Sequence, residues 1–353
     1  MKYLLDNIIF SLQKAGGISI VWQNLIKNLL PLTQDIEFIE YDTNFNIFRK
    51  DLEIPSSKID AIKSFHPLFS QLRTPLIKNS DPFIFHSSYF RTCKNPKAIN
   101  VTTVHDFIYE QGIPTLKQKI RIKLNYRAIR NSDAIVCVSE NTKHDLLRFV
   151  PDVDIKKIHI IYNGVSEDYY TLPNIPYPEY KDYLLFIGGR QGYKNFNFVT
   201  HSIKHTSWKL LICGQNLSKQ EKLLLESTLP NRYKILTFPS NKELNKIYNS
   251  VYALVYPSSY EGFGIPILEA QRASCPVIAL NTSSIPEVIG STPLLMQELT
   301  PEEFIIRLNY LNNQSVKKQV IAAGLENSKR FSWRKMAQEY FRLYNYLLSK
   351  SLH

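Results

Sequence analysis

The chain has 353 residues, of which 44% are hydrophobic, so it can form two folded domains with large cores, and general disorder is excluded. Its formal net charge of +12 suits anionic partners such as nucleotide phosphates, nucleic acid or an acidic membrane surface. The four cysteines are far apart and form no CxxC pair, which argues against a zinc site or a disulfide framework.

Neither a signal peptide nor a membrane-spanning segment is expected. Asp6 and Asn7 interrupt the apolar stretch at the N-terminus, and no small-residue cleavage site follows it. No run approaches the roughly 18 apolar residues that cross a bilayer. We therefore expect a cytoplasmic protein, either soluble or peripheral on the inner face of the plasma membrane.

The first half of the chain alternates short apolar runs with helix-like stretches. After a turn at Gly16 and Gly17, apolar residues at helical spacing predict a helix over 18–30. Strands are expected at 3–12, 36–42, 81–88, 98–107, 134–140 and 157–165.

The same rhythm restarts in the second half. The segment 166–181 is rich in Pro, Tyr and acidic residues and has no period, so we interpret it as a linker. Apolar runs that end in glycine or polar residues then predict buried parallel strands at 182–189, 208–214, 234–240, 253–259 and 276–282.

Both halves therefore predict an α/β fold built from two open, doubly wound sheets, with a site at the carboxyl ends of the strands. The last segment has apolar residues on one helical face, from Trp333 to Leu347. The expected organisation is an N-terminal domain, a linker, a C-terminal domain and a final helix, at 1–165, 166–181, 182–330 and 331–353.

The segment 258–280, SSYEGFGIPILEAQRASCPVIAL, carries the densest functional signal. Glu261 lies in the loop after a predicted strand, and Glu269 lies about one turn inside the helix that follows. The start of a helix favours anions, and a diphosphate fits there. The residues suited to close approach of such a group are Gly262, Phe263, Gly264 and Ile265.

This run, together with the SSIPEVIG that follows it, closely resembles the signature of glycosyltransferase family 4, whose members use nucleotide sugars and have the GT-B fold. The resemblance implies two Rossmann-like domains facing a cleft, with the last helix crossing back to the N-terminal domain. It also implies that Glu261 sits beside the donor sugar and that Glu269 binds the nucleotide ribose. The chain departs from the family at Ser274, where glycine is usual.

The resemblance also implies phosphate-binding roles for two further loops. Arg190 and Lys194 follow a strand and two glycines, and cations at this spacing can clamp a diphosphate and stabilise the leaving group. Without the resemblance, a solvated basic turn is the simpler interpretation. The family also has a Gly-Gly loop that packs against the donor phosphates, which assigns that role to Gly16 and Gly17.

Several polar residues follow strands in the first half. The family has a histidine at the position of His105 that contacts the donor sugar, so His105 is a candidate for positioning the sugar or moving a proton. Asp106 and Glu110 are candidates for binding acceptor hydroxyls, although Asp106 equally suits a helix cap. His86 is an acceptor candidate for which packing is the competing interpretation.

A basic helix is expected near residues 115–132, which contain six Lys or Arg residues and no acid. A solvated amphipathic helix explains this pattern. The alternative is that residues 115–130 contact an anionic membrane and bring the protein to a membrane-embedded acceptor.

The resemblance implies a retaining glycosyltransferase that moves a hexose from a GDP- or UDP-sugar to a glycan or lipid-linked acceptor. By analogy, the sugar is mannose and the pathway is surface-polysaccharide or O-antigen assembly. No Asp-x-Asp motif lies in a loop, so we expect no metal and no cofactor, with cations and helix dipoles taking the leaving-group charge.

Other classes of protein fit less well. A nicotinamide dehydrogenase would need G-x-G-x-x-G after a strand, which neither GGRQGYKN nor AGGIS provides. A nucleic-acid-binding protein would explain the charge, but the chain has no recognised motif for it, and no nucleic-acid partner is expected. A GT-B nucleotide-sugar epimerase or phosphorylase is the closer alternative.

Overall fold

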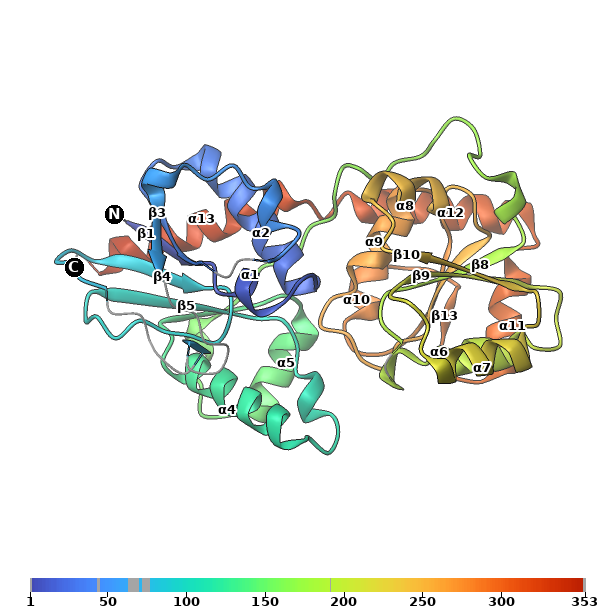
Figure 1. The fold of residues 1–353 in the computed structure, drawn as a ribbon, viewed down its shortest axis with the longest axis horizontal. Coiled ribbons are helices and arrows are strands. Elements are labelled where there is room, and N and C mark those ends of the chain that lie inside the picture. Colours follow the sequence, from blue (N-terminus) through green and yellow to red (C-terminus); the bar gives the residue numbers. More distant parts are fainter. Residues whose placement is uncertain (1, 43–44, 63–69, 72–76, 191, 352–353) are drawn as a thin grey trace. The chain divides into compact units, whose positions relative to one another are not determined.

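The computed structural model describes residues 2–42, 45–62, 70–71, 77–190 and 192–351. The chain divides into two units, which are described separately (Figure 1). The first comprises Met1–Gly164 and Ser332–His353, and the second comprises Val165–Phe331.

The first unit is built on a seven-stranded sheet of order β3-β2-β1-β4-β5-β6-β7, in which every described pairing is parallel. Helices α2 and α13 cover one face of the sheet, and α4 and α5 cover the other (Figure 1). The strands are β1 (Tyr3–Asp6), β2 (Ile36–Tyr41), β3 (Ile59–Ile62), β4 (Phe83–Ser87), β5 (Ala98–Val104), β6 (Ala134–Cys137) and β7 (Ile158–Ile160), and the helices are α1 (Ile9–Leu12), α2 (Gly17–Leu29), α4 (Leu116–Arg130), α5 (Glu140–Phe149) and α13 (Trp333–Lys350).

The second unit has a six-stranded parallel sheet of order β10-β9-β8-β11-β12-β13. Helices α8, α9 and α12 lie on one face, and α6, α7 and α11 lie on the other (Figure 1). The strands are β8 (Tyr183–Ile187), β9 (Lys209–Gly214), β10 (Tyr233–Thr237), β11 (Ala253–Tyr256), β12 (Val277–Leu280) and β13 (Leu295–Met296), and the helices are α6 (Phe196–Ser202), α7 (Lys219–Thr228), α8 (Asn241–Tyr248), α9 (Ile265–Arg272), α10 (Ile285–Ile289), α11 (Pro301–Tyr310) and α12 (Gln314–Ser328).

These sheets confirm the predicted α/β class with two doubly wound sheets. One predicted strand, 3–12, is wrong in its second half, because β1 ends at Asp6 and α1 follows. The side chain of Asn7 donates to Glu40 and accepts from Trp22, so the chain turns there and its apolar run continues as a short buried helix. The short strands β3 and β13 were not predicted, since neither is a long apolar run.

The segment 166–181, predicted as a linker, belongs to the second unit. The backbone N–H of Tyr170 donates to Asn245 on α8, and that of Leu172 donates to Asn249 directly after α8, at 3.0 and 2.8 Å. The hydroxyl of Tyr177 donates to Glu243 on the same helix. These bonds fix the segment along α8.

The last helix, α13, returns to the first unit, as the family resemblance implied. The hydroxyl of Tyr340 lies 2.7 Å from Thr103 Oγ1 on β5, and Tyr3 on β1 donates to Asn345 at 2.7 Å. The predicted apolar face is buried except at Leu347, which is half-buried. Among the described helices, none has the length and apolar character that crossing a bilayer requires.

The return of α13 depends on a close backbone contact at Gly164. A Cβ atom on Gly164 would lie inside van der Waals contact of the Trp333 amide nitrogen. Gly164→Ala is therefore expected to lower the free energy of unfolding by about 1–3 kcal/mol, since backbone cannot move aside as a side chain can. Urea denaturation measures this loss. Gly112→Ala is the control, because that Cβ meets nothing within 4 Å; equal midpoints for the two variants would contradict the prediction.

Candidate functional site

The loop that carries Glu261 connects the carboxyl end of β11 to α9 and is held by the serines before α10. The Glu261 N–H donates to Ser283 Oγ at 2.9 Å. Ser284 Oγ lies 2.9 Å from the Glu261 carbonyl oxygen and 3.0 Å from that of Phe263. The SSIPEVIG segment thus fixes the loop through its backbone.

The start of α9 adopts the geometry that the glycines predict. Gly264 is the N-cap with φ of +107°, in the left-handed region that favours glycine, and Pro266 lies in the first turn. The Phe263 side chain is buried against Phe331, with ring centroids 5.6 Å apart, so only its backbone could serve a ligand. Gly262 and Ile265 are half-buried on either side.

Lys194 and Glu261 lie side by side, although 67 residues separate them in the chain. Lys194 Nζ donates to Glu261 Oε1 at 2.5 Å, and both side chains are more than four-fifths buried. The ammonium also lies 5.2 Å from the ring centroid of Tyr193 and 5.4 Å from that of Tyr256. Burial and the adjacent Glu261 raise the pKa of Tyr256. A fixed cation and a carboxylate therefore share this edge of the sheet.

Arg190 is held differently from Lys194. Its Nε donates to Glu221 Oε1 at 2.6 Å, and its Nη2 contacts the Gln215 and Asn216 carbonyls at 3.1 and 2.9 Å. Nη1 is buried without a hydrogen-bond partner in the described part of the chain. Arg190 thus braces the start of α7, and its part in a diphosphate clamp with Lys194 stays a prediction.

Glu269 lies one turn inside α9 beside two tyrosines. Tyr248 donates to its Oε2 at 3.0 Å, and Tyr169 is also hydrogen bonded to it. Burial raises the pKa of Glu269 to about 7, and the tyrosine hydrogen bonds oppose that rise. The two hydroxyls orient the carboxyl group.

In the first unit, α2 begins at Gly17 and Gly16 is its N-cap. A Cβ on Gly16 would lie 2.7 Å from Gln13 Oε1, while Gly17 has open space beside it. Gln13 Nε2 is buried and, among the described residues, lacks a hydrogen-bond partner. Sequence reasoning did not select Gln13, because no motif includes it.

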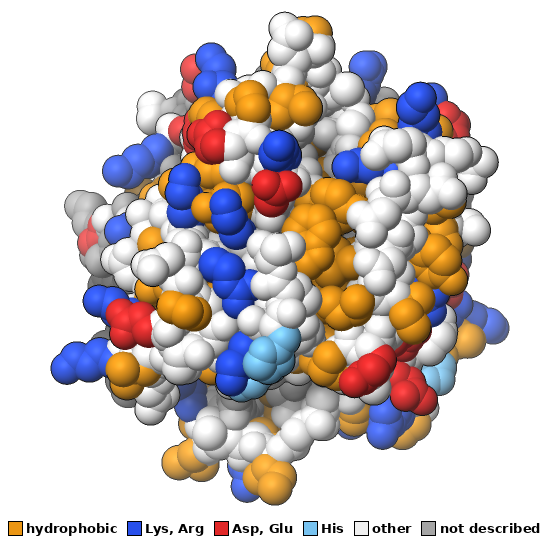
Figure 2. All heavy atoms as spheres, turned by 90° about the vertical axis from the view of Figure 1, so that its right-hand side faces the viewer, with side chains coloured by type: hydrophobic (Ala, Val, Ile, Leu, Met, Phe, Trp, Pro, Cys, Tyr) orange, Lys and Arg blue, Asp and Glu red, His pale blue; other side chains and the backbone are white. Residues whose placement is uncertain are grey.

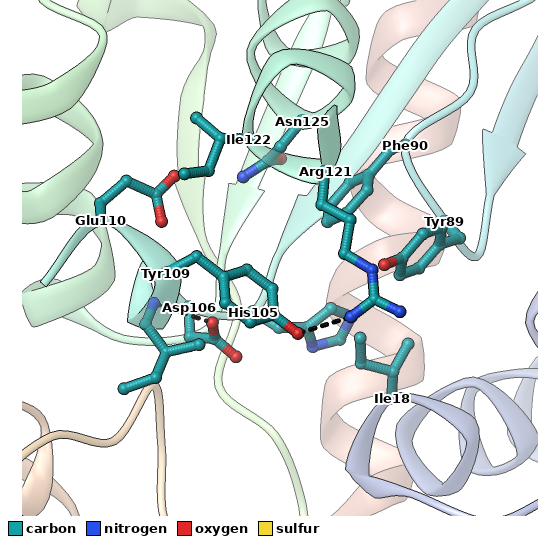
Figure 3. Close-up of a pocket in the computed structure, with 11 residues that line it drawn as sticks. Ile18, Tyr89, Phe90, His105, Asp106, Tyr109, Glu110, Arg121, Ile122 and Asn125 are labelled. Atoms are coloured by element: carbon teal, nitrogen blue, oxygen red, sulfur yellow. Dashed lines mark hydrogen bonds between the residues drawn. The ribbon is translucent and has the colours of Figure 1, made fainter. Parts of the chain in front are cut away.

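His105, Asp106 and Glu110 line one pocket of about 80 Å³ between the end of β5 and α4 (Figure 3). Burial lowers the pKa of His105 to about 4, so the imidazole is neutral at physiological pH. Asp106 accepts from the Ile108 N–H at 3.1 Å, in a local turn before the short helix Ile108–Glu110, whose N-cap is Phe107. Burial raises the pKa of Glu110 to about 7, and the nearby carboxylates of Asp106 and Asp145 add to the rise.

His86 cannot contact an acceptor, because its side chain is fully buried beneath α13. Its Nδ1 lies 2.6 Å from the Tyr344 hydroxyl and its Nε2 lies 3.0 Å from Thr103 Oγ1. Tyr340 stacks on the ring at 5.5 Å between centroids. Burial lowers the pKa of His86 to about 3, so the ring is neutral, and its burial and contacts favour the packing interpretation.

The basic helix is present as α4, with a capping box between Thr115 and Gln118. Its apolar stripe divides: Leu124 and Ala128 are buried, whereas Leu116 is 77% exposed and Ile120 is 38% exposed. On the face of the molecule that Figure 2 shows, Lys and Arg side chains are scattered among acidic and apolar side chains and form no continuous basic surface.

No group of three or more His, Cys, Asp or Glu in the described ranges is arranged to hold a metal ion.

Two family models match the chain. "Glycosyltransferase Family 4" matches residues 15–169, and "Glycosyl transferases group 1" matches residues 173–326. An uncharacterized glycosyltransferase of Methanocaldococcus jannaschii is 28% identical over 367 residues, covering 98% of this chain and 99% of the relative. O-antigen chain mannosyltransferase B of Escherichia coli is 23% identical over 312 residues, covering 82% of this chain and 80% of the relative.

Solved structures share the fold. Sucrose-phosphate synthase of Thermosynechococcus elongatus has a TM-score of 0.77 at 18% identity and 99% coverage of both chains. Anabaena HepE, in complex with UDP and glucose, has a TM-score of 0.74 at 14% identity, covering 97% of this chain and 99% of that chain.

The two Rossmann-like sheets and the returning helix define a GT-B enzyme, and the chain is a glycosyltransferase. More narrowly, it belongs to the group 1 glycosyltransferases of family 4, as the motif at 261–269 implied.

Proposed function

We propose that this glycosyltransferase transfers a hexose, mannose by analogy with its relatives, from a GDP- or UDP-sugar to a glycan or lipid-linked acceptor, with retention of configuration. The observation that carries the proposal is the contact between Lys194 and Glu261 at the carboxyl edge of the second sheet. Relatives named O-antigen mannosyltransferases and the UDP complex of HepE support the choice of donor and pathway.

The proposed mechanism depends on how charged groups stabilise the departing diphosphate and the cationic sugar. When the bond between the anomeric carbon and the diphosphate oxygen breaks, the oxygen keeps the electron pair and the sugar becomes cationic. The Lys194 ammonium and the amino end of α9 stabilise the departing phosphate, and the Glu261 carboxylate stabilises the sugar. The acceptor oxygen then bonds to the anomeric carbon, and its proton passes to the departing diphosphate oxygen, which carries the electron pair of the broken bond. No metal is needed in this scheme, because fixed cations and dipoles carry the charge.

Within this proposal, Glu269 binds the nucleotide ribose, Gly16 and Gly17 pack against the donor phosphates, and Arg190 Nη1 donates to a phosphate. His105 positions the sugar. The exposed Leu116 and Ile120, set among the lysines of α4, support peripheral contact with an anionic membrane that carries the acceptor.

Ligand-induced stabilisation tests the donor and the metal together. GDP or UDP at about 100 times its Kd is expected to stabilise the protein by about 2.7 kcal/mol, and NADH is expected to have no effect. The melting temperature should shift equally in excess EDTA. A shift that EDTA removes and magnesium restores would contradict metal independence, and no shift with either nucleotide would contradict the proposed donor. Release of free sugar or dependence on phosphate would instead indicate an epimerase or phosphorylase.

A further inference from the structure

Two buried tyrosines from different elements support the carboxyl group of Glu269. Tyr248 lies on α8 and Tyr169 lies in the segment 166–181, and their ring centroids are 5.8 Å apart in an edge-to-face arrangement. Glu269 itself is half-buried, so it can still be reached from outside. The tyrosines can therefore hold the carboxyl group while that group stays open to a ligand.

The hydroxyl group of Tyr169 has one proton and two acceptors within reach. It is hydrogen bonded to Glu269, and it lies 3.3 Å from Asn241 Oδ1 at the start of α8. A hydrogen bond to a carboxylate is roughly twice as strong as one to a neutral oxygen. Ionised Glu269 therefore attracts the proton of Tyr169, and any outside group that donates to Glu269 favours this ionised form.

Tyr169 also belongs to a strip of chain, residues 168–172, that contains neither helix nor strand. The strip is held against the neighbouring helices by hydrogen bonds. Arg272 on α9 donates its Nε–H to the Tyr169 carbonyl oxygen at 3.2 Å, and the Tyr170 N–H donates to Asn245 on α8 at 3.0 Å. Segments held by so few bonds open more readily than helices and buried strands. The order of the strip therefore depends on contacts that include the one between its tyrosine and Glu269.

We propose that Tyr169 and Tyr248 are positioning residues for Glu269, and that Tyr169 couples occupation of the ribose site to the ordering of residues 168–172. Ribose hydroxyls that donate to Glu269 keep it ionised, which strengthens its hydrogen bond with Tyr169 and holds the strip against α8 and α9. Such coupling is reciprocal, so an ordered strip also binds the ribose more tightly. The inference rests on the proposed function, in which Glu269 binds the nucleotide ribose.

Removing hydroxyl groups from the protein and from the nucleotide tests the positioning role. GDP and UDP, each beside its 2′,3′-dideoxy analogue, are titrated into the full chain by calorimetry. Tyr169→Phe and Tyr248→Phe should each weaken the ribonucleotide that binds about tenfold, the loss of roughly one hydrogen bond to a carboxylate, and should leave the affinity of its dideoxy analogue unchanged. Phenylalanine keeps the rings packed, and melting temperatures without ligand check the fold. The exposed Tyr310 on α11 provides the control Tyr310→Phe, which should bind as the wild type does.

Hydrogen exchange measured by mass spectrometry tests the coupling. Saturating nucleotide should slow exchange of the Tyr170 and Leu172 amides on the order of fivefold in the wild type. Tyr248→Phe should retain this slowing, because its link to the strip is intact, and Tyr169→Phe should lose it.

The outcomes separate this inference from the proposed donor. Phenylalanine variants that weaken ribonucleotide and dideoxy analogue equally, or weaken neither, would show that the tyrosines serve the fold alone and would overturn the inference. Amide exchange that nucleotide leaves unchanged in the wild type would overturn the coupling. A wild type that binds neither GDP nor UDP would overturn the proposed donor and the inference with it.

Discussion

Glu261→Gln is expected to lower kcat for sugar transfer by about 10²–10³-fold while leaving the fold intact. The substitution removes the negative charge that stabilises the cationic sugar, a loss typical of a charge that acts in the transition state. The loop should keep its shape, because Ser283 and Ser284 hold Glu261 through its backbone N–H and carbonyl oxygen. Steady-state transfer rates and melting temperatures measure the two effects.

A matched control is Glu226→Gln on α7, an exposed glutamate whose carboxylate lies 3.8 Å from Lys222 Nζ. That variant should retain full activity. Near-normal turnover by Glu261→Gln would remove Glu261 from the mechanism. If Glu261→Gln instead lowered the melting temperature so far that the variant was unfolded under the assay conditions, the loss of activity would reflect stability.

Lys194→Met is expected to have the second large effect, a fall in kcat of about 10²–10³-fold, because it removes the ammonium beside Glu261. Methionine preserves the length of the side chain between the Tyr193 and Tyr256 rings. Substrate affinity should weaken as well, since the cation also attracts the ground-state diphosphate. Transfer kinetics at several donor concentrations separate the two contributions.

Arg190→Met is the informative comparison. Arg190 uses its guanidinium to hold Glu221 and the carbonyls before α7, so its loss should mainly lower the melting temperature, with a smaller change in kcat. If Arg190→Met reduced kcat as strongly as Lys194→Met at an unchanged melting temperature, the two cations would act together on the diphosphate, as their spacing alone predicts.

The elements that the sequence predicted well are those with strong local periodicity. Helices α2 and α13 and the buried strands of both sheets follow from spacing of apolar residues over one segment. The short strands β3 and β13 lack that signal, because a strand at a sheet edge needs few apolar residues. At residues 8–12 the apolar run fits a helix as well as a strand, and packing decided between them.

The site was predicted to the extent that its residues lie in one motif. Glu261, Gly264 and Glu269 are close in sequence, and the structure places them around one loop and helix. Ser274 has φ of +59°, which explains why glycine is usual at this turn in the family.

The sequence by itself determined the class of enzyme, since the glycine and glutamate spacing of 261–269 and the alternation of strands and helices are properties of neighbouring residues. Tertiary structure alone decided which distant groups meet: Lys194 with Glu261, Arg190 with Glu221, and His86 with Tyr344 of the returning helix. Such contacts depend on the register of whole strands and helices against one another, and periodicity along the chain carries no information about that register.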